Sequence, residues 1–392
     1  MPAADAVRLT RLTIRDFRNI AAAELRPPAA GLVIVGDNGQ GKTNLLEAAY
    51  YFMLLRSARG ARDGDLVRFG SAAFFLAATI EGGPALEMTV GYERQGRRKR
   101  VRMDGVEVPR LSDALGALPS VMVSPRDVSL VTGSPAERRR FMDVVLAVSS
   151  KGYLHALQQY RRALARRNAA LREVQRAGGK ADEDRVAVWE PALAEHGSTL
   201  WSGRTDWLSG HADRYNALCA AIGEHGTPAM RLTCTPPGGA SRDDSATVLA
   251  SALASRRSHD IRRGITSTGP HRDDLLLTLD DRELRTFGSA GQQRTAAMAL
   301  RLLEAESLRA HAGAPPLMLL DDPFAELDSR RSGRILRLLD EAGLGQVLLA
   351  VPRVADIPDE FTRLDRCGIR EGGLVAASTT GAGGDGMPGA SS

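Results

Sequence analysis

The strongest chemical signal in the chain is one octapeptide, Gly36-Asp37-Asn38-Gly39-Gln40-Gly41-Lys42-Thr43. It has the form GxxxxGK[ST] and stands between an apolar run, residues 32–35, and an amphipathic run that begins at Lys42. In such a loop the glycines let backbone N–H groups surround phosphates, the lysine reaches the β- and γ-phosphates, and the hydroxyl ligates Mg²⁺. Only four of the 52 basic residues are lysines, so a lysine at this position carries information. We therefore predict that these eight residues bind ATP, with Thr43 as a Mg²⁺ ligand.

Two acidic residues follow a second apolar run, Leu317 to Leu320. A buried strand of this kind delivers carboxylates to a phosphate site, and we predict that Asp321 holds Mg²⁺ through water. Asp322 is then placed to orient or deprotonate the attacking water. These two aspartates are the predicted catalytic residues. The next six residues, 323–328, resemble the D-loop of ABC-type ATPases, and Asp328 is their predicted nucleotide contact.

A third element, Ser289-Ala290-Gly291-Gln292, stands at the start of a predicted helix. The stretch from Lys42 to Asp321 is far longer than a compact P-loop kinase or GTPase needs. A long insertion with a Ser-x-Gly-Gln element before the acidic strand is similar to the arrangement of ABC and SMC ATPases. There, a serine and exposed amides at a helix start bind the γ-phosphate held by a second copy of the chain. We therefore predict that Ser289, Gly291 and Gln292 contact ATP in an ATP-dependent homodimer, although the segment alone also fits a plain N-capped helix.

Length and composition exclude several classes of protein. The chain has 392 residues, 43% hydrophobic and 25% charged, with a formal charge of +5. No run of about 18 apolar residues occurs, and Asp5, Arg8 and Arg11 lie where a signal peptide needs an apolar core. The three cysteines are far apart and lack CxxC spacing, which disfavours disulfides and structural zinc. We predict a cytoplasmic protein with no membrane association, whose modest positive charge permits a nucleic-acid partner without requiring one.

Hydrophobic periodicity predicts the elements that position these motifs. Strands are predicted at residues 7–14, 32–35, 74–80, 86–92, 100–103, 275–279, 317–320 and 347–351, and a helix at 42–55. Helical signals dominate residues 137–263, where one apolar seam repeats at spacings of three, four and seven: Tyr153, Leu157, Tyr160, Leu164, Leu171 and Val174. This pattern predicts an α/β fold with an inserted, mostly helical second lobe, and the motif resemblance described above implies that the fold is an ABC/SMC-type P-loop ATPase head. The predicted parts are 1–125 and 265–375 for ATPase lobe I, 126–264 for helical lobe II, and 376–392 for a disordered tail.

Several further stretches resemble the RecF family, bacterial recombination mediators with an ABC/SMC-like ATPase head. The matching stretches are Asp16–Asn19, Gly36–Asn44, Ser124–Asp127, Gly133–Pro135, Arg138–Asp143, Arg166–Leu171, Gly269–Asp274, Gly291–Arg294 and Leu319–Asp328. The resemblance extends from Val7 to about Leu374. The chain departs from the family pattern at Arg126, where an acidic residue is usual, and at Pro323, where valine is common. No histidine follows the strand at 347–351, so we assign no switch histidine.

The resemblance implies a function and a set of partners. It implies ATP-dependent binding of single-stranded and double-stranded DNA at gaps and at junctions between the two, where RecO and RecR help to load RecA. It further implies roles in recombinational repair, replication-fork maintenance and the SOS response. ATP hydrolysis is expected to be weak and stimulated by DNA, and to act as a switch. The alternative is an ATPase subunit of another ABC/SMC-type machine, either a transporter or a chromosome-structure complex.

Basic residues supply the candidate DNA contacts. A predicted hairpin carries five cations within six positions: Arg97, Arg98, Lys99, Arg100 and Arg102. Clustered cations of this kind either contact DNA phosphates or form a solvated turn. A weaker candidate set lies along the helical seam: Arg161, Arg162, Arg166, Arg167, Arg172 and Arg176. His271 and Arg272 are interpreted as either catalytic residues or structural caps.

Overall fold

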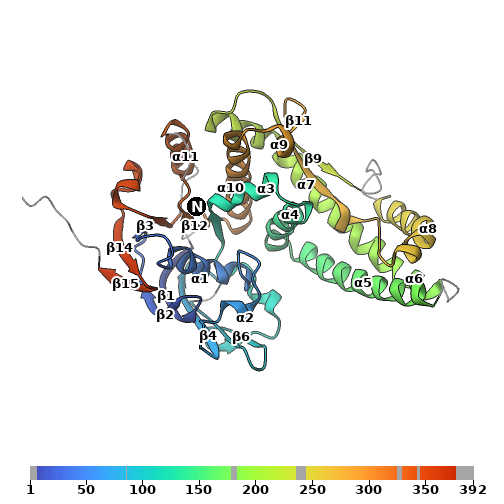
Figure 1. Ribbon diagram of the computed structural model, residues 1–392, viewed down its shortest axis with the longest axis horizontal. Helices are drawn as coiled ribbons and strands as arrows, with labels where there is room; N and C mark the ends of the chain where they lie inside the picture. Colours follow the sequence, from blue (N-terminus) through green and yellow to red (C-terminus); the bar gives the residue numbers. More distant parts are fainter. Residues whose placement is uncertain are drawn as a thin grey trace, which may run out of the picture. The chain divides into compact units, whose positions relative to one another are not determined.

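A computed structural model describes residues 7–84, 86–177, 183–234, 244–324, 329–341 and 345–376 (Figure 1). Contacts within the chain separate these residues into two units, which we name by their dominant elements. The helical unit contains the described residues of 119–316 and 323–345. The sheet unit contains those of 7–118, 317–322 and 346–376. The P-loop and the two aspartates predicted to be catalytic therefore belong to the sheet unit.

One part of the sheet unit is an antiparallel sheet. Its strand order is β2 (Ile20–Leu25), β1 (Arg8–Phe17), β4 (Ala73–Glu81), β5 (Glu87–Glu93), β6 (Arg98–Met103) and β7 (Val106–Glu107). Buried and more exposed residues alternate along β4, and Phe74, Leu76 and Ala78 are on the buried side. This alternation arises because one face of the sheet is covered and the other faces solvent.

The other part of the sheet unit is a mainly parallel sheet. Within the unit its order is β15 (Gly373–Ala376), β14 (Asp365–Arg370), β3 (Gly31–Val35), β13 (Val347–Val351) and β12 (Leu317–Asp321). All pairs are parallel except β14 with β15. Since β3 and β12 run the same way, their carboxyl ends meet at one edge of the sheet. That edge carries the P-loop after β3 and the aspartates at the end of β12.

Helix α1 (Lys42–Leu54) lies between the two sheets. It packs against β12 and β13 of the parallel sheet and against β1 and β4 of the antiparallel sheet. Nearly all of its residues are buried in consequence, and not just one apolar stripe. The shorter elements of the unit are α2 (Asp63–Leu66), η1 (Leu111–Ala114), η4 (Val354–Asp356) and η5 (Asp359–Phe361).

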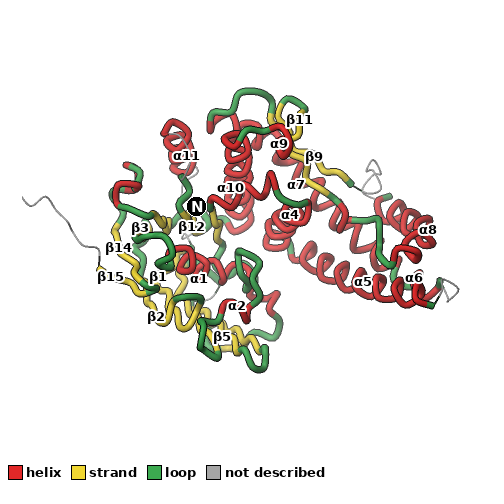
Figure 2. The backbone as a smooth tube through the Cα atoms, viewed as in Figure 1, coloured by secondary structure: helices red, strands yellow, loops and turns green. Residues whose placement is uncertain are grey.

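Five longer helices form most of the helical unit: α4 (Pro135–Ser149), α5 (Lys151–Arg176), α7 (Glu190–Ile222), α8 (Ser245–Arg263) and α10 (Ala290–Ala312). Figure 2 shows α5, α7 and α8 side by side, and these three helices contact one another. The predicted seam is confirmed on α5, where all of its members except the half-buried Leu164 are buried.

Shorter elements complete the helical unit. A small antiparallel sheet has the order β11 (Arg282–Glu283), β10 (Asp274–Leu279) and β9 (Pro228–Thr233), and the predicted helical region therefore contains one strand that periodicity missed. The remaining elements are β8 (Ser120–Val123), η2 (Pro125–Val128), α3 (Ser129–Thr132), α6 (Asp184–Ala187), η3 (Pro270–Arg272), α9 (Leu284–Phe287) and α11 (Ser329–Glu341).

The division into units differs from the predicted lobe boundaries. We predicted that residues 265–375 complete ATPase lobe I, whereas the contacts assign 265–316 to the helical unit. The reason is packing: β10 pairs with β9, and α10 packs against α7 and α4. From this C-terminal segment only residues 317–322 and 346–376 join the sheet unit. The predicted tail lies outside the described residues, apart from Ala376 at the end of β15.

Candidate functional site

The loop between β3 and α1 has a backbone that only glycine fits at two positions. Gly41 is the N-cap of α1 with φ 116°, and a Cβ there would lie 3.0 Å from Asn19 Oδ1. A Cβ on Gly36 would lie 2.5 Å from the carbonyl oxygen of Ile369. Gly39 has φ 82°, and no atom lies within 4 Å of where its Cβ would be, so this part of the loop is open. The loop therefore combines two constrained glycines with an open centre, and Asp37 and Asn38 are exposed beside Gly39.

Lys42 is buried at the first turn of α1. Its Nζ donates hydrogen bonds to the carbonyl oxygens of Gly36 and Asp37, the second at 3.0 Å. Burial lowers the pKa of Lys42, and the nearby carboxylates of Asp321, Asp322 and Asp37 partly offset this. The ammonium group is thus held inside the curve of the loop by backbone oxygens.

Thr43 and Asp321 meet although 278 positions separate them in the sequence. The Thr43 hydroxyl lies 2.8 Å from Asp321 Oδ2 and 3.0 Å from Oδ1. Burial raises the pKa of Asp321, while the Thr43 hydrogen bond and Lys42 oppose the shift. The structure thus brings together the two residues predicted as metal ligands, Thr43 from the first turn of α1 and Asp321 from the end of β12.

Asp322 follows at the end of β12 in an uncommon conformation. Its φ is 47°, in the left-handed region that favours glycine, and its N–H donates to the Ala350 carbonyl at 2.9 Å. Backbone strain of this kind concentrates at functional sites. Burial raises the pKa of Asp322, Asp356 adds to the rise, and Lys42 opposes it. A carboxylic acid with a raised pKa beside a phosphate loop suits proton transfer or the positioning of water.

Sequence reasoning missed a buried ion cluster behind the P-loop. Glu47 of α1 is fully buried and accepts hydrogen bonds from Arg18 at 3.0 Å, from Arg59 and from Ser57. Burial by itself raises the pKa of Glu47, but these donors outweigh it and the net shift is downward. Arg59 also donates to Asn44 Oδ1, and Asn44 donates to Asn19. Hydrogen bonds therefore connect the Asp16–Asn19 stretch, noted only as a family resemblance, to α1, the helix that follows the P-loop.

A second missed feature is the turn between β14 and β15. The Glu371 N–H donates to Gln40 Oε1 at 2.6 Å, and the Gly372 N–H donates to the Gln40 carbonyl at 2.8 Å. Gly372 has φ 79°, and a Cβ there would lie 2.5 Å from the Asn19 carbonyl oxygen. The C-terminal hairpin thus fixes both the main chain and the side chain of Gln40, a P-loop residue.

The Ser-x-Gly-Gln element lies in the helical unit. Ser289 is the exposed N-cap of α10 and forms a capping box with Gln292, with hydrogen bonds of 2.9 and 3.3 Å. Gln292 Nε2 also donates to Glu224 at 3.4 Å. A Cβ on Gly291 would lie 2.5 Å from the Arg331 guanidinium, so α11 approaches the helix start closely. The capped helix is therefore present, and the predicted contact with ATP in a dimer stays a prediction. Asp328 lies outside the described residues.

The five cations of the predicted hairpin do not share one environment. Arg98, Arg100 and Arg102 alternate with less exposed residues along β6 and project from its exposed face, and Arg97 is exposed in the preceding turn. We name the three strand residues the arginine row.

Lys99 faces the other way. Its Nζ lies 2.7 Å from Asp63 Oδ2, donates to the Leu55 carbonyl at 2.7 Å and stands 5.4 Å from the Tyr51 ring centroid. Because this charge is already neutralised inside the sheet unit, Lys99 is removed from the candidate DNA contacts. Sequence reasoning counted it because strand alternation was not applied to the cluster.

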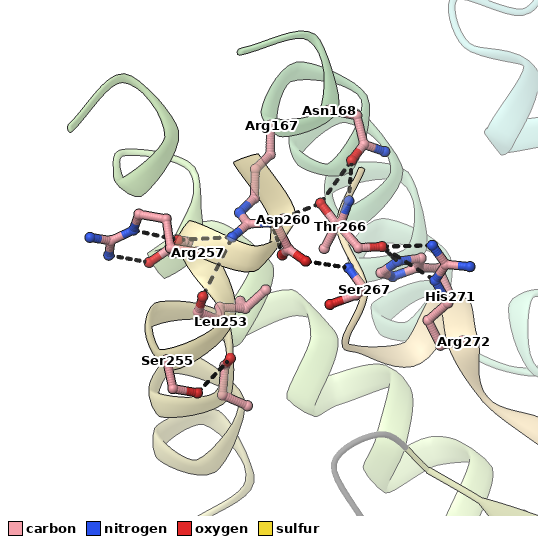
Figure 3. Close-up of polar contacts among 12 residues, drawn as sticks. Arg167, Asn168, Leu253, Ser255, Arg257, Asp260, Thr266, Ser267, His271 and Arg272 are labelled. Atoms are coloured by element: carbon pink, nitrogen blue, oxygen red, sulfur yellow. Dashed lines mark hydrogen bonds and ion pairs between the residues drawn. The ribbon is translucent and has the colours of Figure 1, made fainter. Parts of the chain in front are cut away.

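His271 and Arg272 are structural in this fold. Both donate a hydrogen bond to the Thr266 carbonyl oxygen, His271 Nε2 at 3.0 Å and Arg272 Nη2 at 2.9 Å (Figure 3). His271 Nδ1 also lies 2.7 Å from the Tyr160 hydroxyl. Burial lowers the pKa of His271 to about 4, and the Thr266 hydrogen bond opposes the shift. Of the two interpretations left open, these contacts favour the structural one.

The arginines of the second candidate set are scattered among different environments. Arg167 is fully buried and binds Asp260 at 2.8 Å, Glu190 at 3.0 Å and the Thr266 hydroxyl at 2.9 Å (Figure 3). Arg161 pairs with Asp143, and Arg166 lies 5.1 Å from the Trp189 ring. These contacts engage three of the six arginines inside the helical unit, whereas Arg162, Arg172 and Arg176 are exposed, so the set does not share one environment.

Asp273 and Asp274 also hold the helical unit together. Asp273 is fully buried and pairs with Arg204 at 2.7 Å, and Asp274 pairs with Arg138 at 2.7 Å. The stretches 138–143 and 269–274, noted for their family resemblance, therefore meet directly, whereas 166–171 is connected to 269–274 through Thr266. Over the part of the chain that the structure describes, no helix combines the length and apolar character needed to cross a membrane.

Comparison with known proteins gives consistent matches over most of the chain. Residues 8–353 match the family described as RecF/RecN/SMC N terminal domain. The DNA replication and repair protein RecF of Frankia alni is 37% identical over 91% of this chain and 96% of its own length. The RecF protein of Anaeromyxobacter dehalogenans is 39% identical over 85% of this chain and 89% of its own length.

Solved structures give the same result. The recombination mediator protein RecF of the RecFOR pathway, solved with ATP, superimposes with a TM-score of 0.86 at 26% identity, over 95% of this chain and 98% of that one. An Smc head domain from Pyrococcus furiosus superimposes with a TM-score of 0.53 at 16% identity, over 94% and 95% of the two chains. At that identity the second likeness shows the fold alone. The predicted ABC/SMC-type ATPase head is thereby confirmed.

Proposed function

The chain belongs to the RecF family of DNA replication and repair proteins, and from this premise we propose that it is an ATP-dependent DNA-binding protein of recombinational repair. It acts at single-strand gaps and at junctions of single- and double-stranded DNA, where it promotes RecA loading together with RecO and RecR. The same activity serves replication-fork maintenance and SOS induction. The relatives named above are DNA replication and repair proteins, which disfavours the alternative of a transporter or chromosome-structure ATPase.

The meeting of Thr43 and Asp321 is the observation that carries the proposal. A hydroxyl and a carboxylate within 2.8 Å of each other supply the hard oxygen ligands that Mg²⁺ prefers. Both lie near Lys42, whose ammonium group donates hydrogen bonds to two backbone carbonyl oxygens of the P-loop. These residues fit Mg²⁺-ATP: the loop N–H groups and Lys42 bind the phosphates, and Thr43 and Asp321 hold the metal ion, which offsets phosphate charge when bound.

Hydrolysis and release then depend on the chain's own carboxylates. Asp322 accepts a hydrogen bond from the attacking water and orients it, and its pKa, raised by burial, makes it a better proton acceptor than an ordinary aspartate. Ser289 and the free N–H groups at the start of α10 bind the γ-phosphate held by a second copy, so ATP joins two copies around DNA. A weak ATPase of this kind acts as a timer for DNA release.

The arginine row supplies the contact with the DNA backbone. Residues two apart on a strand are spaced by about 7 Å on one face, so Arg98, Arg100 and Arg102 present three guanidinium groups in line. Guanidinium groups neutralise phosphates without reading base sequence. This suits a protein that recognises the structure of DNA and not a particular site.

The test is binding of labelled gapped DNA by the full chain with ATP, with ADP and with no nucleotide. We expect the tightest binding with ATP. Replacing the three arginines of the row with alanine is expected to reduce the slope of log K against log[salt] by up to about 2.7 on duplex DNA. The matched control removes three exposed arginines that already pair with acids: Arg26, Arg231 and Arg353. Binding that ignores nucleotide, or an equal loss of slope in the control, would overturn the proposal.

A further inference from the structure

The solvent-exposed face of the antiparallel sheet carries an aromatic residue among arginines. Strand register places four residues in one row across the sheet: Arg15 on β1, Phe75 on β4, Gly91 on β5 and Arg100 on β6. Phe75 is 37% exposed, whereas its neighbour Phe74 is 2% exposed and packs in the core. We name these four residues the stacking row.

Space is available directly beside the Phe75 ring. Gly91 is its cross-strand partner, and no atom lies within 4 Å of where a Gly91 Cβ would be. The residues two positions away on β4, Ala73 and Ala77, have the smallest side chains after glycine. Phe75 therefore stands among small residues on an open face, with room for a flat group of the size of a base.

The charges around the ring are uncompensated. In the described ranges of the chain, the side chains of Arg15, Arg98, Arg100 and Arg102 form no ion pair or hydrogen bond. Arg15 is one strand away from Phe75, about 5 Å, and Arg100 is two strands away on the other side, about 10 Å. The stacking row contains no acidic residue, and the acids of this face, such as Glu93 and Glu107, lie in neighbouring rows.

We propose that the stacking row binds single-stranded DNA, with one base stacked on Phe75 over Gly91 and with phosphates at Arg15 and Arg100. The proposal rests on the DNA-binding function proposed above. It adds to that function a site that recognises unpaired bases. An aromatic ring on a sheet with flanking cations is the arrangement by which proteins bind single strands without sequence preference. A duplex cannot use Phe75 in this way because its bases are already stacked on one another, so it engages only the arginines.

The experiment measures the affinity of the full chain, with ATP and Mg²⁺, for labelled oligo-dT and for blunt duplex DNA. Phe75→Ala is expected to weaken oligo-dT binding by about 5- to 150-fold, the range for one lost base–aromatic stack. Phe75→Tyr keeps the ring and is expected to bind as the parent does. Duplex affinity is expected to stay the same in both variants, because the arginines remain.

A second variant fills the open space without touching the ring. Valine suits a strand, and its Cβ at position 91 would meet no atom within 4 Å, so Gly91→Val is expected to retain the fold while the bound base is excluded. Thr89→Val is the matched control on the same face of β5, one row away. ATP affinity and Tm report that the variants are folded.

Three outcomes would overturn the inference. In the first, Phe75→Ala and Gly91→Val bind oligo-dT as tightly as the parent does, and the parent binds gapped DNA. That result would contradict the stacking row but not the proposed function. Another is an equal loss on oligo-dT and blunt duplex. The third is loss of the ATP-dependent dimer in the Phe75 variants, which would assign the face to a second copy of the chain. Failure of the parent to bind any DNA would instead contradict the proposed function itself.

Discussion

At the scale of single residues, the predicted nucleotide site combines Lys42 with three nearby carboxylates, those of Asp37, Asp321 and Asp322. Burial lowers the pKa of Lys42 and raises the pKa values of Asp321 and Asp322, and each of these shifts is opposed by the neighbouring opposite charge. Asp321 accepts a hydrogen bond from the Thr43 hydroxyl, whereas the structure shows no such partner for the Asp322 carboxylate among the described residues. The two adjacent aspartates therefore have different environments and suit different tasks.

We expect Asp322→Asn to stop ATP hydrolysis while ATP binding and dimerisation persist, because the amide keeps the volume but cannot take up a proton. The variant is expected to remain longer on gapped DNA after a competitor chase. Phosphate release and dissociation rates are the measurements. Asp359→Asn, an exposed aspartate of the same unit, is the control, and Lys42→Ala is expected to lose ATP binding altogether. Faster release from DNA by Asp322→Asn would contradict the assignment.

At the scale of elements, two short turns determine how motifs far apart in sequence are held. The β14–β15 turn fixes Gln40 of the P-loop through two backbone N–H groups. The segment between α8 and β10 is bound to the middle of α5 through Thr266, whose N–H donates to Asn168 and whose hydroxyl accepts from the buried Arg167. In both cases a few hydrogen bonds connect elements that hydrophobic periodicity treats as independent.

For the first turn, we expect Gly372→Val to lower ATP affinity by about tenfold. The positive φ and the Asn19 carbonyl, 2.5 Å from the added Cβ, force the turn to move and break its bonds to Gln40. Titration with a labelled ATP analogue measures this. Gly373→Ala is the matched control, because its Cβ would meet only an ordinary contact at 3.4 Å. Equal affinity in Gly372→Val and the parent would show that the turn does not shape the P-loop.

For the second turn, the pKa of His271 predicts a pH-dependent stability. Burial lowers this pKa to about 4, below the ordinary value of about 6.5, so the unfolded chain binds more protons between these pH values. The free energy of unfolding therefore falls as the pH drops from about 6.5 towards 4. At pH 5 the cost is on the order of 2 kcal/mol.

The measurement is urea unfolding of the parent and of His271→Gln at pH 7 and pH 5. Tryptophan fluorescence follows the helical unit, because Trp189, Trp201 and Trp207 all lie in it. Glutamine keeps a hydrogen-bonding group but does not titrate, so this variant is expected to lose less stability on acidification. An identical loss in both proteins would show that His271 does not titrate in this range.

At the scale of the whole molecule, the two units carry different parts of one predicted cycle. The sheet unit holds the P-loop and both aspartates predicted to be catalytic, and the helical unit holds the capped start of α10. In the proposed dimer, the P-loop of one copy binds ATP and the start of α10 of the other copy contacts its γ-phosphate. ATP can therefore join two copies of the chain. The proposed dimer therefore depends on the exposed surface around Ser289.

We expect Ser289→Arg to leave ATP binding by the monomer unchanged and to prevent ATP-dependent dimerisation, since the bulky cation occupies the place of the partner's γ-phosphate. Loss of the N-cap costs only about 1 kcal/mol, so the fold is expected to survive. Sedimentation velocity with ATP and Mg²⁺ is the measurement. Ser255→Arg adds the same charge at an exposed serine of α8 and serves as control. A dimer boundary equal to the parent's would remove Ser289 from the interface.

The sequence by itself determined the features that depend on neighbouring residues. A P-loop needs its glycines, lysine and threonine at fixed spacing, and a strand with one covered face needs alternation, so both are visible in a short window. The P-loop, the acidic strand and most central strands were therefore predicted. Three strands do not give that signal: β2 is half alanine, β14 has only Cys367 and Ile369 as apolar residues, and β15 is four residues long.

Tertiary structure alone decided which distant groups meet and which way each side chain faces. Only packing brings Glu371 to Gln40 and Arg59 to Glu47, and it turns Lys99 inward while its neighbours Arg98 and Arg100 face solvent. The assignment of residues 265–316 to the helical unit has the same origin. The physical reason is that burial and charge pairing depend on distances in space between segments tens to hundreds of positions apart, and no local pattern encodes those distances.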